Sequence, residues 1–142
     1  MVNPTMCKFG YPDTLVREFQ HWAVLVRPAQ VTLGSLVLAS TSDATAYSEL
    51  PADAFAEQGQ AVREVEFALR EFCNYERINY LMLMMVDPHV HFHVIPRYSA
   101  SRQWEGIAFQ DGGWPGPPQL KIAVELDSSQ VSMMRIQLKR LF

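Results

Sequence analysis

The stretch that decides the fold is His89-Val90-His91-Phe92-His93-Val94-Ile95-Pro96-Arg97, with Asp87-Pro88 directly before it. Its three histidines occupy every second position, and apolar residues fill the positions between them. Strict alternation of polar and apolar residues is typical of a β-strand that is buried on one face. We therefore expect a strand with three imidazoles on one face, spaced by about 6.6 Å, and a core-packing face opposite.

Three alternatives to a catalytic role stay open for this row: a chance arrangement on a solvated face, a pH-sensitive surface, and a metal site. The backbones of His89 and His93 lie about 13 Å apart on an extended strand, which prevents all three rings from surrounding one tetrahedral ion. Two rings with an outside ligand could still hold a metal, so a metal-dependent hydrolase is one open function. Phosphate chemistry is another, because neutral imidazole is a nucleophile near pH 7 and protonated imidazole donates to phosphate oxygens.

The pattern His-φ-His-φ-His-φ-φ over residues 89–95, followed by Pro96-Arg97, resembles the motif of the histidine triad (HIT) nucleotide hydrolases and transferases. The proline directly before the first histidine is similar to a short, bacterial-type branch of that family. The resemblance covers about residues 15–97. It implies hydrolysis or nucleotidyl transfer at the α-phosphate of a small nucleotide, of the dinucleoside polyphosphate or nucleoside phosphoramidate type.

The same resemblance assigns roles to the three histidines. It makes His91 the nucleophile that carries a transient nucleotidyl group, while His89 and His93 orient it and contact phosphate. An outer ring, His89 or His93, is expected to contribute most when it is charged. The resemblance also implies a homodimer, a small nucleotide as the partner, and no cofactor or structural metal.

Three positions depart from the family pattern. Ser35 stands where many members have a fourth histidine, and Met85 stands near an asparagine of similar members. Arg27 stands where many members have an aspartate or asparagine that binds ribose, although arginine suits a phosphate better than a diol. These departures leave open a second function, a nucleotide-binding or sensing module without catalysis.

Four residues are candidate contacts to substrate or phosphate: Arg27, Ser35, Asn79 and Arg97. A plainer explanation exists for the last two, because Asn79 could only brace a buried strand and Arg97 could be a surface strand end. The segment 104–119 is rich in glycine and proline and contains Trp104 and Trp114. Its tryptophans either stack on a base or pack against the domain or a second subunit.

Length, charge and composition narrow the class of protein. The chain has 142 residues, which predicts one domain (1–142), with a core at 14–98 and a loop and helix at 99–142. The net charge of −3, without a basic run, gives no electrostatic support for binding a nucleic-acid polymer. The longest apolar run, residues 80–86, is too short to span a membrane. Two isolated cysteines and no apparent signal peptide predict a cytoplasmic protein.

The remaining pattern predicts an α+β fold: an antiparallel sheet of four to five strands, one long packing helix and a C-terminal helix. The lead-in 1–13 is expected to be irregular, with a short helical turn over 15–19. The run 78–86 is nearly all apolar and is expected to be a central strand. The other expected elements are strands over 21–27, 34–40 and 120–126, a helix from 51 through 72, and a closing helix over 131–141 capped by Asp127, Ser128 or Ser129.

Overall fold

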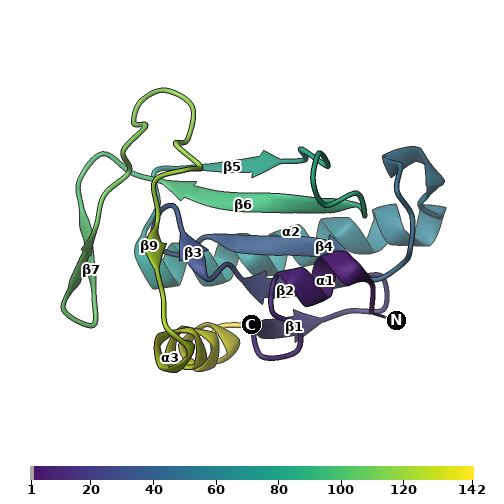
Figure 1. The fold of residues 1–142 in the computed structure, drawn as a ribbon, viewed down its shortest axis with the longest axis horizontal. Helices are drawn as coiled ribbons and strands as arrows, with labels where there is room; N and C mark the ends of the chain where they lie inside the picture. The colour runs from purple at the N-terminus through teal and green to yellow at the C-terminus, as the bar shows by residue number, and fades with distance from the viewer. Residues whose placement is uncertain (1) are drawn as a thin grey trace.

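A computed structural model of the chain describes residues 2–142. Its centre is a five-stranded antiparallel sheet in the order β1-β2-β4-β6-β5 (Figure 1). The strands of this sheet are β1 (Leu15–Glu18), β2 (Trp22–Val26), β4 (Leu36–Ser40), β5 (Arg77–Leu81) and β6 (His91–Arg97). With the long helix α2 (Ala52–Cys73) and the C-terminal helix α3 (Ser128–Lys139), this is the α+β architecture expected from the sequence.

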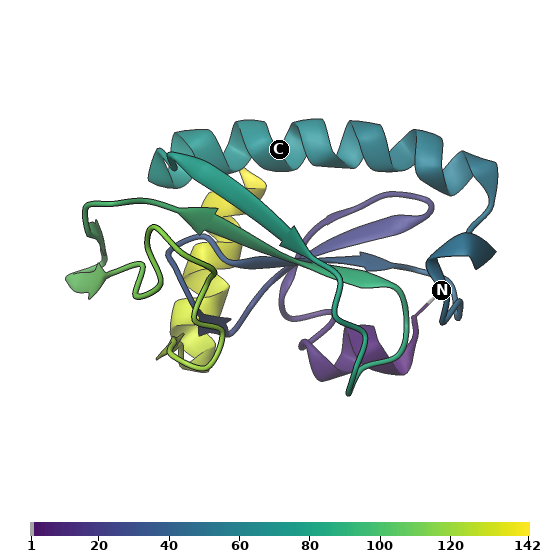
Figure 2. The same cartoon turned by 90° about the horizontal axis from the view of Figure 1, so that it is seen from above.

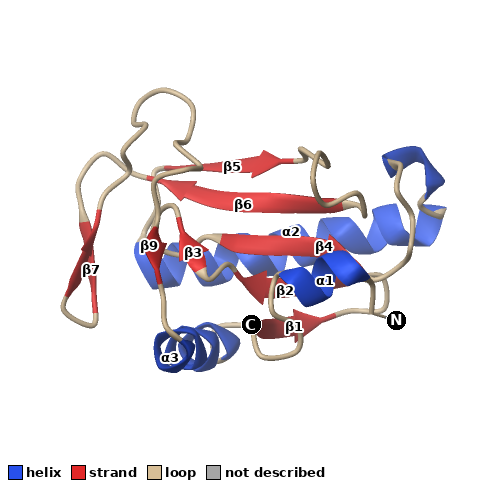
Figure 3. Cartoon of the chain, in the orientation of Figure 1, coloured by secondary structure: helices blue, strands red, loops and turns tan. Residues whose placement is uncertain are grey.

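Shorter elements surround the sheet (Figure 3). They are α1 (Pro4–Lys8), η1 (Tyr47–Glu49), β3 (Ala29–Gln30), β7 (Arg102–Trp104), β8 (Ile107–Phe109) and β9 (Val124–Glu125). β9 is all that is strand in the expected range 120–126, and it pairs with β3 outside the main sheet. The predicted cap of the closing helix is confirmed, since the Asp127 carboxylate accepts a 2.8 Å hydrogen bond from the Gln130 backbone N–H.

The two faces of the sheet are covered very differently (Figure 2). α2 runs along one face and buries Ala61, Val65 and Leu69 against it, which is the apolar stripe that its sequence predicted. The much shorter α1 lies on the other face, beside the β5–β6 loop. The second face is therefore covered by a much shorter helix, although its side chains Leu25, Val37 and Ala39 are also buried.

The sequence prediction for one edge of the sheet is wrong. The segment 15–19 forms the extended edge strand β1 instead of a helical turn, because it pairs with β2 and buries Val16 in the core. The helical turn lies earlier, in α1, where Pro4 follows the cap residue Asn3, whose side chain accepts a hydrogen bond from the Met6 backbone N–H.

The apolar run 78–86 was expected to be a central strand, but only its first part is strand, and β5 lies at an edge. The rest leaves the sheet as a loop in which Met84 has a positive φ of 51°. Met85 and Val86 are 86% and 81% exposed. Apolar composition alone therefore misjudged this segment, since its second half is a loop in which Met82 and Met84 pack against the core while Met85 and Val86 lie exposed.

The triad strand β6 begins at His91, so His89 precedes the strand instead of forming part of it. The expected alternation is confirmed from there on: Phe92 and Val94 face the α2 side, and His91 and His93 face the other. His91 pairs with Ala39 and His93 with Val37 on the central strand β4. The rigid core face of the strand thus fixes where its two imidazoles stand.

Candidate active site

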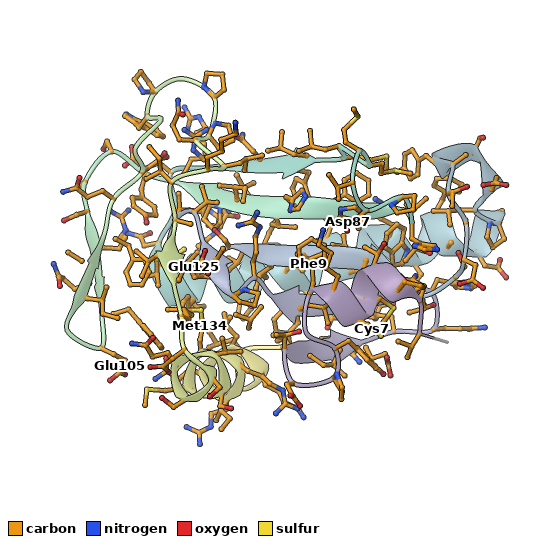
Figure 4. The ribbon with its side chains drawn as sticks, viewed as in Figure 1. Cys7, Phe9, Asp87, Glu105, Glu125 and Met134 are labelled. Atoms are coloured by element: carbon orange, nitrogen blue, oxygen red, sulfur yellow. The ribbon has the colours of Figure 1, made fainter. Side chains whose placement is uncertain are left out.

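A pocket of about 320 Å³ lies on the sheet face opposite α2, and His91 and His93 line it. Phe9 and Asp87, labelled in Figure 4, reach this part of the sheet from the end of α1 and from the β5–β6 loop. The pocket is lined by Lys8, Phe9, Arg27, Leu83, Met84, Met85, Val86, Asp87, His91, His93 and Leu120. Two imidazoles and two cationic side chains thus meet in a hollow with a largely apolar rim.

The His91 side chain is held by the backbone directly before β6. The ring is 1% exposed, and its Nδ1 lies 2.6 Å from the backbone carbonyl oxygen of His89. A carbonyl oxygen only accepts hydrogen bonds, so Nδ1 must carry the hydrogen and donate it. The neutral ring then has its lone pair on Nε2. This is the tautomer that a nucleophilic imidazole needs.

His89 is tied to the N-terminal segment. Its Nδ1 lies 2.9 Å from the Thr5 hydroxyl, and its side chain is half-buried in the turn before β6. Two further contacts join the N-terminal segment to β6 and the loop before it. Lys8 forms a 2.8 Å ion pair with Asp87, and the centroid of the Phe9 ring lies 5.7 Å from those of both the His91 and His93 rings. We call α1 together with Phe9 the N-terminal strap.

The sequence does not predict the strap residues Thr5, Lys8 and Phe9 as site residues, because residues 1–13 are expected to form an irregular lead-in. The signal that could have found the helix is Asn3-Pro4, a cap residue followed by a proline at the first helical position. Contact between the helix and the triad joins residues 84 positions apart in the chain, and no local pattern reports that.

His93 is the less satisfied of the two pocket imidazoles. It is 7% exposed, its ring centroid lies 5.1 Å from that of His91, and its buried Nδ1 has no hydrogen-bond partner within residues 2–142. Burial, followed by the positive charge of Arg27 and by His91, lowers the pKa of His93 to about 4. In the free protein His93 is therefore neutral at pH 7. That an outer ring contributes most when it is charged stays a prediction for the complex with substrate.

Arg27 enters the pocket directly after the end of β2. Its Nη1 donates a 2.6 Å hydrogen bond to the Ala29 carbonyl oxygen, whereas its buried Nε has no partner in the described chain. Burial lowers the pKa of the guanidinium, and the negative charge of Glu125 partly opposes this. The residue keeps its charge near neutral pH because an arginine pKa starts far above that range.

Several solved structures share this architecture, although no protein-family model and no curated protein matches the sequence. A histidine triad protein from Sinorhizobium meliloti 1021 is 18% identical and superposes over 100% of this chain and 96% of its own, with a TM-score of 0.76. One from Bradyrhizobium japonicum is 19% identical over 99% and 96%, with a TM-score of 0.74. The chain has the histidine triad fold. The diadenosine triphosphate hydrolase of Plasmodium falciparum, 12% identical over 91% of this chain and 76% of its own, also matches, with a TM-score of 0.67.

Within this histidine triad fold, Ser35 lies away from the pocket. It is fully buried, its hydroxyl donates to the Thr32 carbonyl oxygen at 2.7 Å, and the Thr32 backbone N–H donates back to that hydroxyl at 3.0 Å. These bonds close the turn before β4, in which Gly34 takes a positive φ of 91° against Leu69. A contact between Ser35 and substrate stays a prediction.

Arg97 and Asn79 also lie outside the pocket of the histidine triad fold. The Arg97 guanidinium forms a two-pronged ion pair with Asp111, at 2.6 and 3.1 Å, and donates to the Asn79 side chain at 2.8 Å and to the Gly116 carbonyl oxygen at 2.7 Å. These contacts fasten the loop around residues 111–116 to the sheet. Trp114 lines a separate hollow beside Arg97 and Asn79.

Trp104 packs inside the domain. It is buried, and its indole N–H donates to Gln137 of α3 at 2.7 Å. Packing against the domain is thus the observed arrangement for this one of the two loop tryptophans.

Two further features of the described chain bear on function. No helix within residues 2–142 is long and apolar enough to cross a membrane. Over the same range, no three side chains of the His, Cys, Asp or Glu type lie close enough together to hold a metal ion.

Proposed function

We propose that the chain is a nucleotide hydrolase or nucleotidyl transferase that acts at the α-phosphate of a small nucleotide. The substrate type we propose is a dinucleoside polyphosphate or a nucleoside phosphoramidate. The observation that carries the proposal is the hydrogen bond from His91 Nδ1 to the His89 carbonyl oxygen, which leaves a lone pair on Nε2 of a pocket-lining ring. The shared fold supports it, since a diadenosine triphosphate hydrolase is among the structures of that fold.

The proposed reaction has two displacements at one phosphorus. His91 Nε2 first forms a bond to the α-phosphorus, while the bond to the leaving phosphate or amine breaks and its electron pair departs with that group. The phosphorylated ring is then cationic, and the His89 carbonyl that accepts the Nδ1 hydrogen stabilises it. Water, or another acceptor, next attacks the same phosphorus, the P–N bond breaks, and its electron pair returns to Nε2.

A non-catalytic nucleotide-binding or sensing module is the second candidate. Arg27 Nε and His93 Nδ1, which have no partner within residues 2–142, favour a bound anion but do not by themselves require turnover. A metal-dependent hydrolase is third. The homodimer implied by the resemblance also remains a proposal, and light scattering of the purified protein tests it.

The test is release of a mononucleotide from a panel of adenosine polyphosphates and nucleoside phosphoramidates. His91→Ala should slow release by about 10³-fold or more and leave the circular dichroism spectrum unchanged. His21→Ala is the matched control, because His21 is the one histidine outside residues 89–93 and does not line the pocket. Equal rates for parent and His91→Ala would refute the proposed role.

The same panel separates the two other candidates. Nucleotide binding by calorimetry without any product would favour the sensing module. Loss of activity with a chelator, and its return with added metal, would favour the metal-dependent hydrolase.

A further inference from the structure

The pocket has two ends, and strand register tells them apart. His93 pairs with Val37 of β4, and Val37 pairs with Leu25 of β2. Arg27 follows two residues later on the same face, and the ladder continues to it, because its backbone N–H donates to the Ser35 carbonyl oxygen. Arg27 is therefore two strands across from β6 and beyond His93 in the direction away from His91.

Standard sheet spacings convert this register into distances. With strands about 4.8 Å apart and about 3.3 Å per residue, the Arg27 backbone lies about 12 Å from that of His93 and about 16 Å from that of His91. All three side chains nevertheless line one pocket. The Arg27 side chain thus enters the pocket from the side of His93 that faces away from His91.

Arg27 forms no ion pair within residues 2–142, although the negative charge of Glu125 lies near enough to act on its pKa. The ion pairs within residues 2–142 join Lys8 to Asp87, Arg17 to Glu64, and Arg97 to Asp111. In the described part of the chain, the buried Nε–H of Arg27 has no acceptor, and Nδ1 of the neighbouring His93 has no hydrogen-bond partner. Buried polar atoms are rarely left unpaired, and here the two residues that carry such atoms line the same hollow. An oxyanion is the type of ligand that accepts hydrogen bonds from a guanidinium.

An uncharged ribose diol suits this end of the pocket poorly. A diol needs acceptors, and the carboxylate in the pocket lining, Asp87, is paired with Lys8. Arg27 supplies only donors. The chemistry that matches is a phosphate-type oxyanion.

We propose that Arg27 binds a second phosphate group of the substrate, separate from the phosphate that His91 attacks. The inference rests on the proposed function for the identity of the first phosphate. The substrate is then a nucleotide with two separated phosphates. The second phosphate is either attached to the ribose or placed at the far end of the phosphate chain.

Calorimetry with three probes tests this on the His91→Ala background, where no turnover interferes. The probes are AMP, ADP and adenosine 3′,5′-bisphosphate at one ionic strength. At least one of the two-phosphate probes should bind about tenfold or more tightly than AMP. Preference for the bisphosphate places the second phosphate on the ribose, and preference for ADP places it on the chain.

Adding Arg27→Gln should abolish that preference and leave AMP affinity within about twofold. Arg77→Gln is the matched control, because Arg77 is an exposed arginine of β5 that does not line the pocket. Arg27→Lys should retain part of the preference, since it keeps the charge but loses the planar donor pair. If Arg27→Gln does not fold, the salt dependence of binding is measured instead on the protein that keeps Arg27. Affinity should then fall more steeply with salt for the preferred probe than for AMP.

Two results would overturn the proposal: equal affinity for all three probes, or equal losses for AMP and the two-phosphate probes in Arg27→Gln. The second would mean that Arg27 grips the phosphate next to His91. Failure here and failure of the proposed function are distinguishable, because these are binding measurements and the function is tested by product release.

Discussion

Arg97 and Arg27 both lie where a strand ends, on the same face of the sheet, but they differ in how far the protein satisfies their hydrogen-bond donors. Arg97, at the end of β6, has a side chain that is 5% exposed and gives its donors to Asp111, Asn79 and Gly116. Arg27, directly after β2, gives one donor to Ala29, and its buried Nε has no partner in the part of the chain that the structure describes. A charge that the protein itself satisfies holds the structure together. One that it leaves unsatisfied is available to a ligand.

The pocket histidines show the same contrast at shorter range. His91 is fixed by the His89 carbonyl, and this bond selects its tautomer. His93 is also buried, but its Nδ1 has no hydrogen-bond partner among residues 2–142. The first is prepared for one reaction geometry, and the second remains free to bond to whatever enters the pocket.

The largest expected effect is on stability, and it comes from removing the carboxylate that pairs with Arg97. Asp111→Ala should lower the free energy of unfolding by about 3 to 5 kcal/mol, because it leaves the Arg97 charge buried and unpaired. Urea unfolding measures this, with Arg77→Ala as the exposed control at about 0 to 1 kcal/mol. The folded variant should keep its kcat within about a factor of two, because Asp111 does not line the pocket. Unchanged stability with lost activity would reverse the roles given to the two arginines.

The sequence predicted the parts of this comparison that are local. Alternation placed His91 and His93 on one face, and helical periodicity placed Val65 and Leu69 of α2 against the other. Both signals survive because each is repeated within one element.

What the sequence could not predict depends on distant partners. Nothing beside Arg27 or Arg97 in the chain says that Asp111 will pair with the second and not with the first. Thr5 reaches His89 only because α1 folds back over the sheet. The run through Met85 had the composition of a buried strand, yet it lies exposed at the rim of the pocket.

An intermediate effect concerns His93 and pH. Its pKa is about 4 in the folded protein against about 6.5 in the unfolded chain, so between these values the unfolded state binds more protons. The contribution of neutral His93 to the free energy of unfolding is therefore fully present above about pH 6.5, and it is lost as the pH falls through about 4. Relative to pH 7, the parent should lose about 3 kcal/mol more than His93→Gln by pH 4. Chemical denaturation at several pH values measures the difference, and parallel curves would show that His93 titrates normally.

The smallest effect concerns the N-terminal strap. Thr5→Val keeps the shape of the buried side chain but removes the hydroxyl that bonds to His89 Nδ1. One lost hydrogen bond of about 1 kcal/mol predicts a fall in kcat of about fivefold. Thr45→Val, in an exposed loop, is the control. The effects of Thr5→Val and His89→Gln should be less than additive when combined. Full additivity would mean that the strap does not act through His89.

The most direct test of the account is a search for a nucleotidyl group bound covalently to His91. The protein is mixed with a dinucleoside polyphosphate, quenched at alkaline pH because the P–N bond of a phosphorylated imidazole is acid-labile, and digested for mass spectrometry. The account predicts one nucleotidyl group on the peptide that contains residues 89–97, located at His91 and absent from His91→Ala. Turnover without such an adduct, or an adduct on a residue outside the pocket, would contradict it.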